Sequence, residues 1–174
     1  MTATRKGQQD TFAIVIDTRE KLPLIFDGTI RTVRKFIRTG DYSVEGYEDQ
    51  FAVERKSIPD LIGTLTAGRS RFERELQRMA GIAFRRVIVE GSLRQVIASA
   101  KRVEQDKRRR VRTSSIIGTI YAFEVRYGVP FVFAAQGARE AAWRVEKWAR
   151  YFVRERRITE AVILSPPPSP YDVD

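Results

Sequence analysis

The sequence contains neither cysteine nor histidine. Without cysteine, the chain has no disulfide framework, no thiolate zinc site and no cysteine nucleophile. Without histidine, it has no serine–histidine pair, no imidazole general base and no histidine-ligated metal. Any catalysis by this chain must therefore use carboxylates, lysine, arginine, hydroxyl groups or a hard metal ion held by oxygen atoms.

Long hydrophobic runs are also missing. The apolar run 12–16 is far shorter than the roughly 20 residues that cross a bilayer. The polar residues at the N-terminus are not followed by an apolar stretch like that of a secretory signal. We therefore expect a cytoplasmic protein with no membrane partner. The length of 174 residues and the 43% hydrophobic content fit one domain with a substantial core.

Negative charge is scarce relative to positive charge. The chain has 32 basic and 22 acidic residues, a net charge of +10, and most of the basic residues are arginine. Segment 101–112 alone carries seven basic and two acidic residues. Because the planar guanidinium group matches phosphate well, the leading partner is a phosphate-rich polymer. A generic solubilising surface is the alternative.

The hydrophobic pattern predicts a single α/β domain around a mixed sheet flanked by helices. Apolar or alternating runs predict strands over 12–16, 32–37, 42–44, 51–56, 86–90 and 130–134, with an edge strand over 161–164. Amphipathic spacing and end signals predict helices over 57–66, 70–80, 93–103, 114–127 and 139–156. We expect a flexible N-terminus over 1–11, a folded domain over 12–164 and a proline-rich tail over 165–174.

The strand over 51–56 carries the first candidate site. Side chains alternate in direction along a strand, so Glu54 and Lys56 share one face. An acid and a lysine at the end of an apolar strand are costly unless they have partners. Asp41, at the start of the preceding strand, can reach them across the hairpin. Asp17 ends the neighbouring apolar strand and can approach from the other side.

Such a cluster has a definite chemical use. Carboxylate oxygens hold Mg²⁺, which prefers octahedral oxygen coordination and keeps several waters. The ion lowers the pKa of water and neutralises charge on a phosphoryl oxygen, while a lysine orients the water or stabilises the transition state. The alternative is that Glu54 and Lys56 form an ordinary exposed ion pair.

Several segments together resemble the nuclease domain of the XPF family of structure-specific endonucleases, especially its compact single-domain bacterial and phage members. The segments occur in the family's order, at 16–20, 40–42, 53–57 with 60–61, and 68–73. Weaker likeness continues at 87–91, 116–118 and 127–130, so the resemblance covers about residues 12–157. The constellation Gly-Asp…Glu-Arg-Lys-x-x-x-Asp, which begins at Gly40 and ends at Asp60, is highly specific.

The resemblance implies a restriction-endonuclease-like fold. It also implies hydrolysis of a DNA phosphodiester near a single-strand/double-strand junction, such as a flap or fork, with Mg²⁺ or Mn²⁺. DNA repair, recombination and phage DNA processing are the processes in which such an enzyme acts. If the chain is bacterial or phage-encoded, the resemblance places it with the nucleoid in the cytoplasm.

The resemblance further implies roles for individual residues. The implied catalytic residues are Asp17, Asp41, Glu54 and Lys56. The implied metal ligands are Asp41, Glu54 and the main-chain carbonyl of Arg55. The implied supporting residues are Arg19, Glu20 and Asp60. We also expect a set of basic residues to bind DNA phosphates, namely Arg69, Arg71, Lys107, Arg108, Arg109, Arg110 and Arg112.

Several of these residues have a structural alternative. Asp60 is either a site residue or the acidic partner in a helix capping box. Arg69 and Arg71 either clamp phosphate or lie on a solvated helix start. Arg19 either lines the site or pairs with a neighbouring acid, Glu20 or Asp41. Tyr42 either stacks on an unpaired base or packs within the sheet.

Many relatives carry a tandem helix-hairpin-helix module after the nuclease domain, and 174 residues leave no room for it. The basic run 107–112 either replaces part of this DNA contact or is a flexible loop with no defined register. A separate DNA-binding partner subunit is the other source of this DNA contact that we consider. The apolar strip Ala141, Val145, Trp148 and Phe152 on the last helix favours a homodimer. A non-catalytic scaffold that binds DNA junctions and a nuclease that acts on RNA are the alternative functions.

Overall fold

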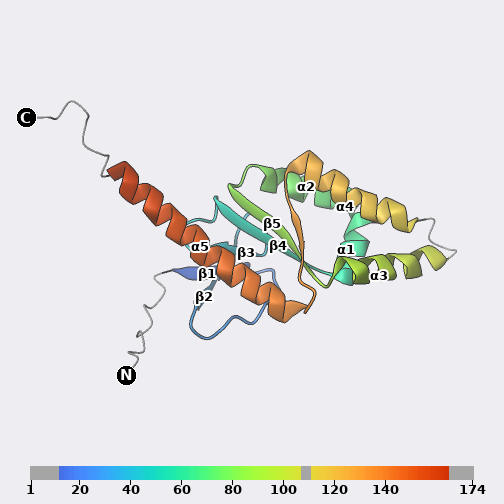
Figure 1. Cartoon of the computed structure of the whole chain (residues 1–174), viewed down its shortest axis with the longest axis horizontal. Coiled ribbons are helices and arrows are strands. Elements are labelled where there is room, and N and C mark those ends of the chain that lie inside the picture. The colour runs from blue at the N-terminus through green and yellow to red at the C-terminus, as the bar shows by residue number, and fades with distance from the viewer. Residues whose placement is uncertain (1–11, 107–110, 165–174) are drawn as a thin grey trace, which may run out of the picture.

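The computed structural model describes residues 12–106 and 111–164 and shows an α/β domain (Figure 1). The strands are β1 (Ala13–Ile16), β2 (Arg31–Arg34), β3 (Tyr42–Val44), β4 (Phe51–Ser57), β5 (Phe84–Glu90) and β6 (Phe131–Phe133). The helices are α1 (Ile58–Leu65), α2 (Arg69–Ala80), α3 (Leu93–Gln105), α4 (Thr113–Tyr127) and α5 (Ala138–Leu164). The predicted fold class, a mixed sheet flanked by helices, is confirmed.

The six strands form one sheet in the order β2-β1-β3-β4-β5-β6. β3 lies antiparallel to both of its neighbours, β1 and β4. The remaining adjacent pairs, β1 with β2, β4 with β5, and β5 with β6, are parallel. The central strands are continuous apolar runs because helices cover both faces of the sheet.

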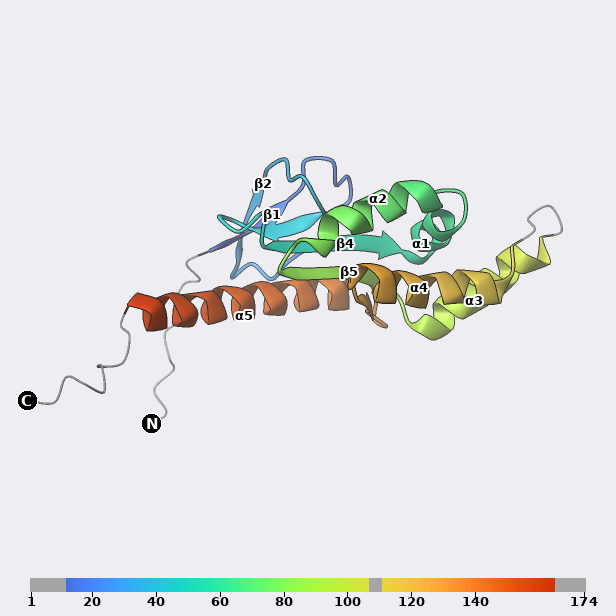
Figure 2. The same cartoon turned by 90° about the horizontal axis from the view of Figure 1, so that it is seen from above.

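Two buried clusters fill the space on the two faces of the sheet. On one face, side chains of α1–α4 pack against Ala52, Val87 and Val89. On the other face, α5 packs against Val53 and Ile88 together with side chains of β1 and β3. Figure 2 shows α5 running along one side of the sheet and α2 lying on the opposite side.

The alternation of β4 decides which residues face which helices. Ala52 belongs to the cluster under α1–α4, whereas Phe51 and Val53 belong to the cluster under α5. Because side chains alternate along a strand, Glu54 and Lys56 follow Ala52 onto the α1–α2 face. The shared face that the sequence predicts for these two residues is therefore confirmed.

Two predicted strands differ from the structure. The edge strand expected over 161–164 is wrong, because α5 continues as a helix to Leu164. No glycine or proline interrupts the sequence between Ala138 and Leu164, so nothing stops the helix once it has started. The strand expected over 32–37 is shorter at its C-terminal end, since β2 spans Arg31–Arg34.

The apolar strip of α5 is occupied within the chain. Ala141 and Val145 are buried against the sheet, and Trp148 and Phe152 pack against the same cluster. The strip therefore offers no free surface for a second copy, and a homodimer stays a prediction without that support. By contrast, Trp143 on the same helix is largely exposed.

Some expectations fall outside the described residues: the flexible N-terminus 1–11, the tail 165–174 and four basic residues, Lys107, Arg108, Arg109 and Arg110. Within the two described ranges, no helix is both long enough and apolar enough to cross a membrane.

Candidate active site

A cavity of about 640 Å³ lies where the C-terminal end of β4 meets α1, α2 and the loop after β1. Most of the residues that the sequence singles out line it. Its charged lining residues are Arg19, Glu20, Lys21, Asp41, Glu54, Arg55, Lys56, Asp60, Arg71 and Glu75. The fold therefore brings acids and bases from segments far apart in the sequence into one hollow.

Glu54 and Lys56 lie side by side within this cavity. Only 3% of Glu54 is exposed, and its Oε1 forms an ion pair with Nζ of Lys56. The Lys56 ammonium also lies 5.2 Å from the centre of the Phe72 ring of α2. The pair is thus largely buried, so the exposed ion pair that the sequence left open as an alternative is wrong.

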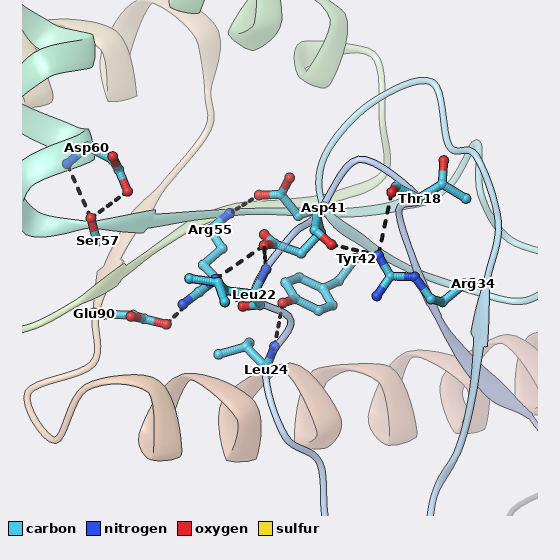
Figure 3. A network of polar contacts seen from close by, with 11 residues as sticks. Thr18, Leu22, Leu24, Arg34, Asp41, Tyr42, Arg55, Ser57, Asp60 and Glu90 are labelled. Atoms are coloured by element: carbon cyan, nitrogen blue, oxygen red, sulfur yellow. Dashed lines mark hydrogen bonds and ion pairs between the residues drawn. The ribbon is translucent and has the colours of Figure 1, made fainter.

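Asp41 is the residue directly before β3, and it lines the cavity. Its Oδ2 accepts a hydrogen bond from the backbone N–H of Arg55 at 2.8 Å, as Figure 3 shows. Its own backbone N–H donates to the carbonyl of Val53 at 2.8 Å, and its carbonyl accepts from the N–H of Asp17 at 2.9 Å. These bonds fix Asp41 between β1 and β4.

Gly40 makes this placement of Asp41 possible. Its φ is +81°, in the left-handed region that side chains disfavour. A Cβ atom at Gly40 would lie 3.0 Å from the carbonyl oxygen of Val53. The backbone therefore approaches β4 closely only because residue 40 has no side chain.

Burial raises the pKa values of both carboxyl groups. Burial, opposed by the Arg55 hydrogen bond and the Lys56 charge, raises the pKa of Asp41 to about 6. Burial and the negative charge of Asp41 raise the pKa of Glu54 well above its usual value. Although burial acts against it, the charge of Glu54 raises the pKa of Lys56. The ionised forms of Asp41 and Glu54 are therefore destabilised in the cluster, and a bound cation would stabilise them.

Asp17 does not line the cavity. Only 1% of it is exposed, and its carboxylate accepts from Nε and the backbone N–H of Arg19, both at 2.7 Å, and from the N–H of Ile37 at 2.9 Å. Although burial acts against it, these hydrogen bonds lower the pKa of Asp17. The structure thus places Asp17 as the anchor of Arg19, and its catalytic role stays a prediction.

Arg19 is held by neither of the acids proposed as its structural partners, Glu20 and Asp41. It pairs with Asp17, and its Nη2 donates to the carbonyl of Ile37 at 2.9 Å. Its guanidinium also lines the cavity. The prediction that Arg19 supports the site therefore has a geometric basis.

Arg55 ties three segments together beside the cavity (Figure 3). Its Nε pairs with Glu90 of β5 at 2.5 Å, and its Nη1 donates to the carbonyl of Leu22 at 2.6 Å. Nη1 also lies 3.5 Å from Oε1 of Glu20. The Arg55 side chain therefore clamps the loop after β1, while its backbone N–H holds Asp41.

Comparison with known proteins identifies the family. The ERCC4 domain matches residues 16–143, well over half of the chain. The chain belongs to the ERCC4 domain family. Comparison with curated protein sequences finds no match.

Solved structures agree on the fold of this ERCC4 domain. The structure of XPF from Aeropyrum pernix in complex with DNA is 21% identical, with a TM-score of 0.59 over 82% of this chain and 66% of that chain. A second structure of XPF from Aeropyrum pernix is 23% identical, with a TM-score of 0.60 over 80% of this chain and 60% of that one. The chain thus spans less than two thirds of either structure.

Asp60 contacts the N-cap of α1 and also lines the cavity. The Ser57 hydroxyl accepts from the N–H of Asp60 at 3.2 Å and donates to Oδ2 of Asp60 at 2.5 Å, which caps α1. Asp60 also lines the cavity, because α1 starts directly at its edge. The Ser57 cap of α1 is confirmed, but the Asp60 carboxylate bonds the Ser57 hydroxyl and not its backbone N–H, so the reciprocal capping box is not formed, and a role of Asp60 in the site stays a prediction.

The arginines expected to bind phosphate lie in two places. Arg71 of α2 lines the cavity with Glu54 and Lys56. Arg69 and Arg112 instead line a separate hollow of about 800 Å³ between the end of α1, the start of α2 and the start of α4. All three stay predicted DNA contacts, and only Arg71 is next to the acidic cluster.

Tyr42 is a packing residue of the ERCC4 sheet. None of it is exposed, and its hydroxyl accepts from the N–H of Leu24 at 2.8 Å (Figure 3). Its ring also meets the Phe26 ring edge-on. A base therefore cannot stack on Tyr42 in this structure.

Sequence reasoning missed Glu75 of α2. This residue lines the cavity, and its negative charge helps to raise the pKa of Glu54, after burial and the charge of Asp41. Its position, three residues after the buried Phe72 and one before the buried Leu76, was the available signal. A residue at the border of a buried helix face lies beside whatever that face covers.

The family implies a divalent metal ion, and the donor atoms fit one only in part. Among the described residues, no three Asp, Glu, His or Cys side chains converge closely enough to hold an ion. Asp41 and Glu54 nevertheless supply two hard oxygen donors in a place where negative charge is destabilised. Mg²⁺ suits such a pair, since it is usually held by one or two carboxylates and several waters.

Proposed function

We propose that this ERCC4 domain is a divalent-metal-dependent endonuclease. Its substrate is DNA, cut near a single-strand/double-strand junction such as a flap or fork in repair, recombination or phage DNA processing. The observation that carries the proposal is the convergence of Asp41, Glu54 and Lys56 in one cavity. The family match supports it independently.

Asp41 and Glu54, with the main-chain carbonyl of Arg55, are the groups that would hold Mg²⁺ or Mn²⁺. The bound ion supplies Lewis-acid chemistry, because it lowers the pKa of water and neutralises charge on a phosphoryl oxygen. The hydrogen bond from the N–H of Arg55 keeps the Asp41 carboxylate oriented toward β4. Glu54 needs no such bond, since burial and the Lys56 contact hold it in place.

Lys56 acts on the phosphate or on the attacking water. Its ammonium group carries three donors, one of which already contacts Glu54. The others are available to orient water or to stabilise charge on the phosphoryl oxygens in the transition state. Arg71 and Lys21 line the same cavity and supply positive charge for the neighbouring phosphates. We expect products with 5′-phosphate and 3′-hydroxyl ends.

A cleavage assay tests this proposal. The purified chain is incubated with labelled flap, fork, splayed-arm, duplex and single-stranded DNA, with Mg²⁺ and with EDTA. We expect cutting of the branched DNAs only with Mg²⁺, and its loss in Glu54→Gln and Asp41→Asn. Glu160→Gln, an exposed acid on α5, is the control that should cut normally.

The other outcomes separate the alternative functions. Binding of junctions without cutting in any divalent metal would show a scaffold and refute the endonuclease. Cutting of matched RNA structures in preference to DNA would show an RNA-directed nuclease. Cutting that is unchanged in both site variants would place the reaction elsewhere in the chain.

A further inference from the structure

Phe36 lies in the segment between β2 and β3 and contacts Arg19, a residue that lines the cavity. Its side chain is 62% exposed, although a phenylalanine normally gains from burial. The guanidinium of Arg19 lies over its ring, 5.0 Å from the ring centre. Because Arg19 also lines the cavity, the exposed ring lies next to the candidate active site.

The buried carboxylate of Asp17 fixes the positions of Arg19 and of the segment that carries Phe36. Asp17 holds Arg19 through Nε and the backbone, and it also accepts from the N–H of Ile37, the residue after Phe36. Arg19 in turn donates to the carbonyl of Ile37. These four hydrogen bonds, among Asp17, Arg19 and Ile37, therefore hold the guanidinium and the segment that carries the ring in one relative position.

The charge around the ring favours a nucleic acid over a protein partner. Phe36 lies within the sequence Arg34-Lys35-Phe36-Ile37-Arg38. Lys35 pairs with Glu48 at 2.7 Å, so Arg34 and Arg38 carry the positive charge of this segment. Such interleaving of cations and an aromatic ring suits a strand with phosphates and flat bases. An apolar protein partner would gain little from the cations, which it would have to desolvate.

We propose that Phe36, backed by Arg19, is a stacking platform for one unpaired base of the DNA strand that enters the cavity. This inference rests on the proposed function, and it defines the substrate more closely. In a duplex, both faces of each base are covered by neighbouring bases, so only an unpaired or terminal base offers a free face. The platform would thus give the enzyme its preference for junctions.

Fluorescence of 2-aminopurine tests the platform without any cleavage. The base is placed at the unpaired nucleotide beside the junction of a flap, and Ca²⁺ replaces Mg²⁺. We expect the wild-type chain to quench the fluorescence on binding, and Phe36→Ala to lose the quench. The flap Kd should rise at least about fivefold in Phe36→Ala, while the Kd for paired duplex changes less than about twofold.

Two further variants and one control complete the design. Phe36→Trp should keep the quench, whereas Phe36→Leu, which keeps apolar volume without a ring, should lose it. Tyr121→Ala removes an aromatic side chain of α4 that is 52% exposed, and it should change neither Kd nor quench. Thermal unfolding of each variant should match that of the wild type, because the side chains replaced are exposed.

The platform is refuted if Phe36→Ala leaves the flap Kd and the quench unchanged, or if it weakens flap and duplex equally. An equal effect of Tyr121→Ala would also refute it. Failure of the proposed function is a separate result, namely no cutting by the wild type in Mg²⁺. A wild type that cuts flaps while Phe36→Ala binds and cuts them equally well would refute the platform alone.

Discussion

The Asp41 carboxylate accepts a hydrogen bond from the backbone N–H of Arg55 at 2.8 Å. Arg55 lies between Glu54 and Lys56 on β4, so this bond sets the distance between the acid of one strand and the acid and lysine of the next. The bond uses Oδ2 alone, and a carboxylate has two acceptor oxygens, so Oδ1 can accept from another partner. The two carboxylates and the lysine thus form one unit, and their separate duties can be distinguished by mutation.

The first prediction separates Lys56 from the two acids. Lys56→Ala should abolish cutting of flap DNA yet keep Mn²⁺ binding, because a lysine is not a metal ligand. Glu54→Gln should lose both cutting and Mn²⁺ binding. Isothermal titration of Mn²⁺ into each purified variant measures the difference, with Lys147→Ala on α5 as the matched control for a lysine. Loss of Mn²⁺ binding in Lys56→Ala at an unchanged fold would contradict the assignment.

The second prediction concerns the cost of keeping Asp41 ionised. The pKa of Asp41 is about 6 in the folded protein and 3.8 for an unperturbed aspartate. Between about pH 4 and 6 the native state therefore binds a proton on Asp41 that the unfolded state has lost. The stability that this protonated form gives to the native state is lost as the pH rises through about 6. Asp41→Asn should consequently raise the free energy of unfolding by about 1–3 kcal/mol at pH 7.5, without metal.

Urea unfolding of both proteins at pH 4.5 and pH 7.5 in EDTA checks this prediction. The gain in Asp41→Asn should be larger at pH 7.5, because at pH 4.5 the wild-type carboxyl group is already protonated. Added Mn²⁺ should stabilise the wild type but not the variant. A variant that is less stable than the wild type at both pH values would show that Asp41 is not destabilised by its burial.

The third prediction isolates the close approach of Gly40 to β4. Gly40→Ala and Gly46→Ala both place a side chain at φ near +80°, which costs about 1–2 kcal/mol. At Gly40 the new Cβ would also meet the carbonyl oxygen of Val53 at 3.0 Å, whereas a Cβ added at Gly46 would meet nothing within 4 Å. Gly40→Ala should therefore be destabilised further, by about 1–3 kcal/mol, and should lose cutting. Equal unfolding free energies for the two variants would contradict this account.

The sequence was sufficient to predict that Asp41, Glu54 and Lys56 lie together, because they belong to neighbouring segments of the chain. Alternation along β4 places Glu54 beside Lys56, and a hairpin brings Asp41 next to them, so short-range rules decide the geometry. The position of Asp17 was different. Its bond from Ile37 depends on how the segment after β2 folds back on the end of β1, which no local pattern encodes.

The errors have physical causes of the same kind. The residues over 161–164 are apolar and partly β-branched, which favours a strand, but a helix already in progress continues at little cost when nothing stops it. The apolar strip of α5 was visible as a pattern, yet a pattern cannot say whether a sheet of the same chain or another chain covers it. The place of Glu75 in the cavity could not be predicted, because it depends on how α2 packs over the end of β4 in the tertiary structure.

The fourth prediction tests how Glu75 acts on the cavity. Its negative charge contributes to the raised pKa values of both Glu54 and Asp41, after burial, which is the largest cause. Glu75→Gln should therefore let both acids ionise at lower pH, and the acidic limb of Mn²⁺ binding against pH should move to lower pH. On the plateau above this acidic limb, where Mn²⁺ affinity no longer depends on pH, binding should change little.

Glu73→Gln is the matched control on the same helix. Glu73 pairs with Arg126 at 3.2 Å and does not line the cavity, so its removal should leave the pH profile in place. A large loss of Mn²⁺ affinity on the high-pH plateau in Glu75→Gln alone would mean that Glu75 is itself a ligand, reached by movement of α2 when the ion binds. An unshifted acidic limb in Glu75→Gln would mean that Glu75 has no part in setting the protonation of Asp41 and Glu54.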